Sequence, residues 1–181
     1  MQRLLRVFRA HRESLQICGL FGGIIAAFFL ITSIKPVYEV TVAPFTAVVA
    51  WVSTRFLEMG FDGVVRQGTI IRIEGGTPLD IKDECNGIYA TFIFLAATLA
   101  YPARLVPKLI GLGGGFLAIF LVNQVRVVTL FVIAKNWPSL MEDFHIFVWQ
   151  TVVVIFAVLL WLFWADRIAG RRSGPATPEG K

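Results

Sequence analysis

Four long apolar runs constrain this chain more than any other feature of its sequence. A helix of roughly 20 predominantly apolar residues spans the hydrocarbon core of a membrane, and 56% of the 181 residues are hydrophobic. The runs predict an all-α integral membrane helical bundle with about four transmembrane helices. We expect these spans at about 15–34, 87–103, 108–126 continuing to 134, and 144–165.

Basic residues beside the runs predict which ends face the cytoplasm, because Lys and Arg collect on that side of a membrane. They stand before the first run, between the second and third, and after the last: Arg3, Arg6, Arg9, Arg12, Arg104, Lys108, Arg167, Arg171 and Arg172. Both termini are therefore expected inside, with a basic leader at 1–14, a single membrane-embedded catalytic domain at 15–168 and a disordered tail at 169–181. A cleaved signal peptide is the competing interpretation of the first run. The run is as long as a span and lacks a small-x-small cleavage pattern, which favours a retained anchor.

The segment at 40–60 is apolar enough to be a further span, but a crossing there would put the leader's arginines outside. We therefore expect an amphipathic or half-inserted helix on the outer face. After it, residues 68–84 alternate apolar and polar side chains around Gly75-Gly76, a pattern typical of a small extracytoplasmic β-hairpin. This hairpin either caps the surface or walls a site.

Cys85 lies between that hairpin and the second span, among Asp83, Glu84, Asn86 and a glycine. With Asn86 or Cys85 itself as the N-cap, the thiol lies at a helix N-terminus, where the dipole favours the thiolate unless Asp83 and Glu84 oppose it. A membrane cysteine is more often a small buried hydrophobe, which is what we expect of Cys18 in the first span. A disulfide between two cysteines at such different depths is not expected.

Arg126 interrupts the third run, and an arginine in the hydrocarbon region usually faces a protein interior or a polar cavity. Asn123 lies three residues earlier and therefore on the same face of the helix. The alternative is that Arg126 only reaches up to the lipid headgroups as an anchor.

His145 begins the last span, after Glu142 and Asp143 and one turn before Gln150. A lone interfacial histidine is often only a satisfied polar residue. The predicted topology nevertheless brings His145 to the same membrane face as Cys85 and Arg126. Histidine can accept the thiol proton and return it to a leaving amine, while arginine can stabilise a thiolate or an oxyanion. These three residues predict a thiol acyl-transferase or protease.

Two other classes of function remain open. A non-enzymatic membrane assembly or chaperone subunit would use Cys85 and Arg126 for packing or gating. A metal site could combine Cys85 and His145 with Glu84 or Asp143, but the chain has no HxxxH or CxxC spacing, so we predict neither a metal nor a cofactor. Nucleic-acid binding is not indicated, because the net charge of +5 is concentrated in the cytoplasmic flanks.

Three motifs together resemble the exosortase/archaeosortase family of integral-membrane cysteine transpeptidases, most closely the compact exosortase H type. They are ECNGI at the start of a span, NQVR near the outer end of the next, and a histidine heading the last. The resemblance covers about residues 55 to 150 and implies Cys85 as nucleophile with Arg126 and His145 as its catalytic partners. Glu84, Asn86 and Asn123 are expected to bind substrate or support the site. Asn86 departs from the family, which more often has Ser, Thr or Ala there.

The resemblance also implies a substrate and a place in the cell. The substrates would be membrane-tethered exported proteins whose C-terminal sorting signal is a short motif, a transmembrane helix and a basic end. Cleavage would occur on the periplasmic or exterior side of a bacterial plasma (inner) membrane, and water or a cell-surface amine would resolve the acyl-enzyme. Gly111, Gly113, Gly114 and Gly115 could allow close helix approach, with packing as their simplest role.

Overall fold

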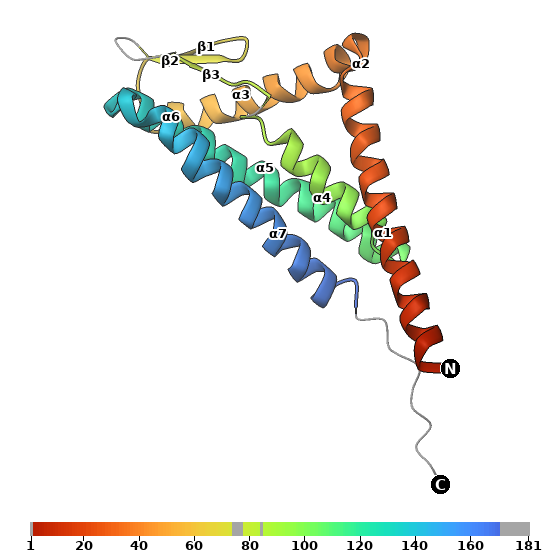
Figure 1. Ribbon diagram of the computed structural model, residues 1–181. Helices are drawn as coiled ribbons and strands as arrows, with labels where there is room; N and C mark the ends of the chain where they lie inside the picture. The colour runs from red at the N-terminus through yellow and green to blue at the C-terminus, as the bar shows by residue number, and fades with distance from the viewer. Residues whose placement is uncertain (1, 74–77, 84, 171–181) are drawn as a thin grey trace.

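The computed structural model of the chain describes residues 2–73, 78–83 and 85–170, and it is a helical bundle with one small sheet (Figure 1). Five helices form the bundle: α1 (Gln2–Thr32), α3 (Val42–Glu58), α4 (Ile88–Ala100), α5 (Leu105–Asn136) and α7 (Gln150–Arg167). Shorter elements join them: α2 (Lys35–Val40), a 3₁₀ turn (Pro138–Leu140), α6 (Met141–Asp143) and a π-helical segment (Phe144–Trp149). The all-α membrane bundle predicted from the apolar runs is confirmed.

Four helical stretches are long and apolar enough to cross a membrane, namely Ser14–Thr32, Lys35–Glu58, Leu105–Asn136 and Pro138–Arg167. Their number matches the prediction, but their identities differ at two places. The expected span at 87–103 is the 13-residue helix α4, which at 1.5 Å per residue extends only about 20 Å. It ends early because Pro102 follows directly after Tyr101, and a residue before proline is disfavoured in the helical conformation.

The segment expected as an outer-face helix at 40–60 forms α3, and its length and apolar character would also permit a crossing. In Figure 1 α1 runs to the upper end of the molecule, where α2 turns the chain. Helix α3 then runs across that end and does not return beside α1. Its buried residues face α5 and the sheet. This end of the molecule, with α2, α3 and the sheet, is called the sheet end below.

The sheet has three strands, one more than the predicted hairpin. β1 (Val64–Gln67), β2 (Ile70–Ile73) and β3 (Leu79–Asp80) pair antiparallel in that order. β1 and β2 are joined at Gly68, whose φ of 63° is a left-handed conformation that glycine adopts without steric cost. β2 and β3 are the strands expected on either side of Gly75-Gly76, with Ile71 opposite Leu79, but residues 74–77 lie outside the described residues. β1 was not predicted because its four residues, VVRQ, do not show the alternation of apolar and polar side chains that marks a strand.

Two hydrophobic cores divide the molecule along its length. The larger core lies at the sheet end, where Val49 and Leu57 of α3 meet Ile71 of the sheet and Leu130 and Phe131 of α5. The smaller core is built by Phe94, Ile119 and Ala157, from α4, α5 and α7. Cys85 belongs to the larger core, so the sheet and α3 support the segment that carries it.

Close helix approach at the smaller core depends on glycine, as expected, but at two positions rather than four. A Cβ on Gly115 would collide with the ring of Phe94 in α4, and one on Gly111 would collide with the indole of Trp164 in α7. Gly113 and Gly114 lie on the other side of α5 and meet no such neighbour. Packing of α5 against α4 and α7 therefore requires Gly111 and Gly115.

Helix α1 lies at the edge of the bundle and packs on α4 through aromatic pairs. Phe28 stacks on Phe92 at 4.7 Å between ring centroids, and Phe29 stacks on Tyr89 at 5.4 Å. The expectation that Cys18 is a buried hydrophobe is wrong, because its side chain is exposed on α1. Because α1 packs chiefly on α4, much of its described surface is free, and in a membrane that surface faces lipid.

Candidate active site

Cys85 lies in the short connection between β3 and α4, and local hydrogen bonds define its position. Its backbone N–H donates to the carbonyl of Lys82 at 2.8 Å, which closes a turn. Two residues later Gly87 adopts φ = 80°, and the chain turns there into α4. Only 5% of the Cys85 surface is exposed, so the thiol is buried at the sheet end.

The helix cap differs in detail from the expectation. Gly87, rather than Asn86 or Cys85, occupies the N-cap position of α4, because its left-handed backbone lets the helix begin at Ile88. Asn86 nevertheless satisfies a free helix N–H: its Oδ1 accepts a 2.8 Å hydrogen bond from the backbone N–H of Ile88. Its Nδ2 donates to Oγ1 of Thr46 in α3 at 2.7 Å. Asn86 is fully buried, and it fastens the Cys85 connection to two helices at once.

Three elements bring Cys85, His145 and Arg126 together. The Sγ of Cys85 lies 2.8 Å from Nε2 of His145, and Nη2 of Arg126 donates to the same sulfur at 3.7 Å. Arg126 is only 3% exposed, so it does not reach to a headgroup region as the alternative interpretation required. The three residues come from the β3–α4 connection, from α5 and from the segment before α7.

His145 lies in the π-helical segment Phe144–Trp149, which precedes α7 without a break in the chain's helical path. A π-helical turn holds more residues than an α-helical turn, and such turns often occur at functional sites. The expected apolar span beginning at residue 144 contains this segment. Hydropathy alone could not reveal it, because the hydrogen-bond pattern changes while the composition does not.

Around this centre, α5 presents buried polar groups that lack partners among the described residues. Both side-chain polar atoms of Asn123, Nε2 of Gln124 and Nε of Arg126 are buried without a hydrogen bond. Asn123 lies against Gly87, where a Cβ would come within 3.0 Å of its Cγ. Asn123 therefore lies against the turn that follows Cys85, whereas Glu84 lies outside the described residues.

Two contacts at the site were missed by the sequence analysis. Ser53 of α3 donates to Oε1 of Gln124 at 2.6 Å, and Tyr38 of α2 donates to Oδ1 of Asp83 at 3.1 Å. Together with Thr46, these residues show that α2 and α3 hold the Cys85 connection and α5 in place. No sequence signal links residues so far apart in the chain, and only the fold of α3 over the site brings them together.

A cavity of about 140 Å³ lies between the start of α4 and the start of α7, and Arg126 lines it, whereas Cys85 and His145 do not. Its wall near Cys85 is polar and contains Asp83, Gly87, Arg126 and Gln150, and its other wall is apolar. Across the described ranges, no three His, Cys, Asp or Glu side chains are grouped so that they could hold a metal ion. The chemistry available at this position is therefore that of a thiol, an imidazole and a guanidinium beside a small open space.

Such an arrangement suits nucleophilic catalysis. A cysteine becomes strongly nucleophilic as a thiolate, and a hydrogen-bonded imidazole is a suitable proton acceptor. A guanidinium within reach of the sulfur stabilises negative charge there or on an adjacent oxygen. Removal from water strengthens these interactions, because charges attract more strongly in a medium of low dielectric constant.

Comparison with known protein families supports a single assignment. A family model described as "Transmembrane exosortase" matches residues 17–165, which include the second half of α1, the sheet and every later helix as far as the last turn of α7. Neither a curated protein nor a solved structure matches the chain. The matched region is wider than the 55 to 150 covered by the three motifs and contains Cys85, Arg126 and His145. The chain belongs to the transmembrane exosortase family.

Proposed function

We propose that this protein is a membrane-embedded cysteine transpeptidase or protease that cleaves C-terminal sorting signals of membrane-tethered exported proteins. The observation that carries the proposal is the 2.8 Å distance between Sγ of Cys85 and Nε2 of His145. A buried thiol paired with an imidazole is the arrangement that nucleophilic catalysis by cysteine requires. Membership of the exosortase family supports the same reaction class.

The reaction proceeds in two stages. His145 accepts the proton of the Cys85 thiol, and the resulting thiolate attacks the carbonyl carbon of the scissile peptide bond. The C–N bond of the tetrahedral intermediate then breaks, His145 gives the proton to the departing amine, and a thioester on Cys85 remains. Water or an amine on a cell-surface acceptor attacks the thioester and releases the sulfur, which recovers its proton through His145.

Arg126 stabilises the negative charge in this sequence. Its Nη2 lies within 3.7 Å of the sulfur, where it favours the thiolate before attack. During attack the charge moves from sulfur to the carbonyl oxygen, and the guanidinium can follow it because its donors form a fixed planar fork. Asn86 and Asn123 support the turn between Cys85 and α4.

The basic flanks favour an orientation in which both termini lie in the cytoplasm and the reaction occurs on the outer side of a bacterial inner membrane. This orientation puts the sheet end at the periplasmic face. Exported proteins that are anchored by a C-terminal transmembrane helix present the residues before that helix at the same level. We call such a protein, with its motif, apolar helix and basic end, the precursor.

Membrane proteomics of the source organism tests the proposal. Cells carrying Cys85→Ala or Cys85→Ser should accumulate uncleaved precursors, identified by peptides from their C-terminal helices that are lost in wild-type cells. Cys18→Ala is the matched control, because Cys18 is the other cysteine and its side chain is exposed on α1. Normal cleavage by stably inserted Cys85→Ala protein would contradict the proposal and favour a non-enzymatic assembly or chaperone subunit.

A further inference from the structure

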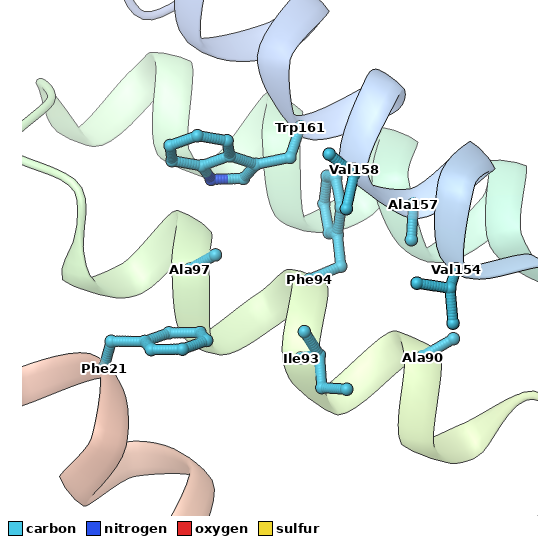
Figure 2. A pocket seen from close by; sticks show the side chains of 9 residues that line it. All are labelled: Phe21, Ala90, Ile93, Phe94, Ala97, Val154, Ala157, Val158 and Trp161. Carbon is cyan, nitrogen blue, oxygen red and sulfur yellow. The ribbon is translucent and has the colours of Figure 1, made fainter. Parts of the chain in front are cut away.

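The face of α7 that lies toward α4 follows the spacing of an ordinary α-helix. Figure 2 shows part of this face, where side chains of α7 line an apolar cavity of about 200 Å³ together with α1 and α4. With the residues of α7 that line the cavity beside Arg126, the side chains on this face recur at i, i+3, i+4, i+7, i+8 and i+11: Gln150, Val153, Val154, Ala157, Val158 and Trp161. Residues at these intervals share one face of an α-helix, so this packing fixes the orientation of α7 from Gln150 onward.

The spacing changes before Gln150, in the π-helical segment. His145, whose Nε2 lies 2.8 Å from the sulfur of Cys85, stands five residues before Gln150 instead of three or four. An α-helix continued backwards from Gln150 would turn Ile146 and Phe147 toward this face, because they stand four and three residues earlier. In the structure these two side chains are exposed, Ile146 by 46% and Phe147 by 68%. The π turn therefore adds one residue to the helix and presents His145 to the site in place of Ile146.

Two side chains before the π turn hold the chain to the larger core. Met141 and Phe144 stand three residues apart, and both pack against that core, to which Cys85 also belongs. These contacts fix the direction in which the next residue, His145, points. The face of α7 toward α4 fixes the direction of the residues that follow. The two directions differ by the rotation of one residue, about 100° in an α-helix, and the π turn accommodates the difference.

We propose that Phe144 is a positioning residue, which keeps the π turn in place and thereby directs His145 at the sulfur of Cys85. This inference rests on the proposed function. π-helical turns are rare and short, so the contacts at their two ends must hold them against the α-helical alternative. When the contact of Phe144 with the core is removed, the segment relaxes to α-helical hydrogen bonds. His145 then turns by about 100° and leaves the sulfur, while Ile146 takes its direction.

The reactivity of Cys85 reports the position of His145 without requiring a substrate. The full-length protein in membranes, with Cys18→Ala so that one of its two cysteines remains, is treated with iodoacetamide across a range of pH. The thiolate is the species that reacts, and both His145 and Arg126 lie where they favour it. Loss of the His145 contact should therefore raise the pH midpoint of alkylation, while Arg126 stays in place.

Phe144→Ala should raise this midpoint by at least about one pH unit, which is the smaller end of the effect of a close charged partner. Precursor cleavage should fall at least about tenfold, because the proton acceptor is misplaced. Phe147→Ala is the matched control in the same segment and should change neither quantity, since Phe147 is 68% exposed and is not among the residues packed on the larger core. An unchanged midpoint in Phe144→Ala would overturn the inference.

Two further variants distinguish a change of direction from a loss of folding. Adding Phe144→Ala to His145→Ala should raise the midpoint no further than His145→Ala alone, because the same contact is lost in both. Deletion of Phe147 from the Phe144→Ala protein should reverse the shift, because His145 then stands four residues before Gln150 and faces the site in a plain α-helix. A loss of folding would instead expose the sulfur and speed alkylation at every pH. An additive shift, or a shift that persists in the stably inserted deletion protein, would overturn the inference.

Failure of this inference and failure of the proposed function give different results. Normal cleavage by Cys85→Ala would remove the protease and leave the alkylation experiment as a test of the position of His145. If Cys85→Ala stops cleavage while Phe144→Ala matches Phe147→Ala in both measurements, Phe144 has no positioning role and the enzyme remains.

Discussion

The two halves of α5 are built on opposite principles. The first half packs by shape: Gly111 and Gly115 let the rings of Trp164 and Phe94 lie against the helix backbone. The second half buries Asn123, Gln124 and Arg126, and Arg126 donates to the sulfur of Cys85. One helix therefore holds the bundle together at one end and carries chemistry at the other.

This difference means that the second half of α5 lowers the stability of the fold. Four side-chain polar atoms on these three residues are buried without a hydrogen-bond partner among the described residues. Each such group destabilises the fold by about 1–3 kcal/mol, because it loses water without gaining a hydrogen bond. The first half has no comparable burden. Substitutions in the two halves should consequently have opposite effects on stability and on cleavage.

The largest effect on cleavage is expected from Arg126→Met, which keeps much of the side-chain length and removes the charge. Cleavage should fall at least about 100-fold, because removal of one preorganised charge-stabilising donor commonly costs that much. The amount of folded protein should not fall, since the substitution removes a charge that is costly to bury. Quantitative immunoblots of precursor and product, normalised to the variant's membrane level, measure both effects.

Arg126→Lys sharpens the result. Lysine restores the positive charge but not the planar fork of donors. Partial recovery would indicate that charge alone serves the sulfur, while no recovery would indicate that the guanidinium geometry is required. Full activity of Arg126→Met would break the comparison, because the polar half would then have no chemical role.

Gly115→Leu tests the packing half and should act through folding. The new side chain would collide with the ring of Phe94, which is only 2% exposed. Overpacking of this kind typically costs about 1–3 kcal/mol, so the melting temperature and the amount of inserted protein should both drop. Gly114→Leu is the matched control, because nothing lies near a Cβ at that position. Equal stability of the two variants would contradict the close packing of α4 on α5.

Asn86→Ala tests the β3–α4 connection beside the polar half of α5, at a position that does no chemistry itself. It removes both the acceptor for Ile88 N–H and the donor to Thr46, so the turn carrying Cys85 loses its connection to α3. Cleavage should fall about tenfold, because even a small displacement of Cys85 from its reactive position lowers the rate of the reaction. Cleavage by Asn86→Ser should fall less, because the serine hydroxyl can still accept a hydrogen bond from Ile88 N–H. A greater loss with Ser than with Ala would contradict a positioning role.

The sequence predicts a membrane-embedded helical bundle and brings Cys85, Arg126 and His145 to one membrane face. Polar residues in apolar runs are costly, so Arg126 and the motif around Cys85 are conspicuous. The basic flanks then give the number of crossings between Cys85, Arg126 and His145. Crossing parity predicts only that these residues lie on one face of the membrane, and their contact is seen in the structure.

The remaining features could not be predicted in this way, because they depend on tertiary contacts. Asn86 looked unexplained beside Cys85, and its role emerges only when α3 brings Thr46 within 2.7 Å. The short α4 and the π-helical turn at His145 change geometry without changing hydropathy. The strand β1 is too short to show a pattern of its own and forms only by pairing with β2.

The smallest expected effect is that of Thr46→Val, which removes a hydroxyl and keeps the shape of the side chain. Oγ1 of Thr46 accepts from Asn86 and donates to the carbonyl of Val42 at 3.0 Å, so the variant leaves Nδ2 of Asn86 without its acceptor. Cleavage should fall about fivefold, in line with the roughly 1 kcal/mol of a single neutral hydrogen bond. Thr46→Ser should restore it by returning the hydroxyl. Combining Thr46→Val with Asn86→Ala should then cost no more than Asn86→Ala alone, because residues that share one hydrogen bond are not additive. An additive loss would mean that α3 acts on the site by a route other than Asn86, and the polar half of α5 would be the place to look for it.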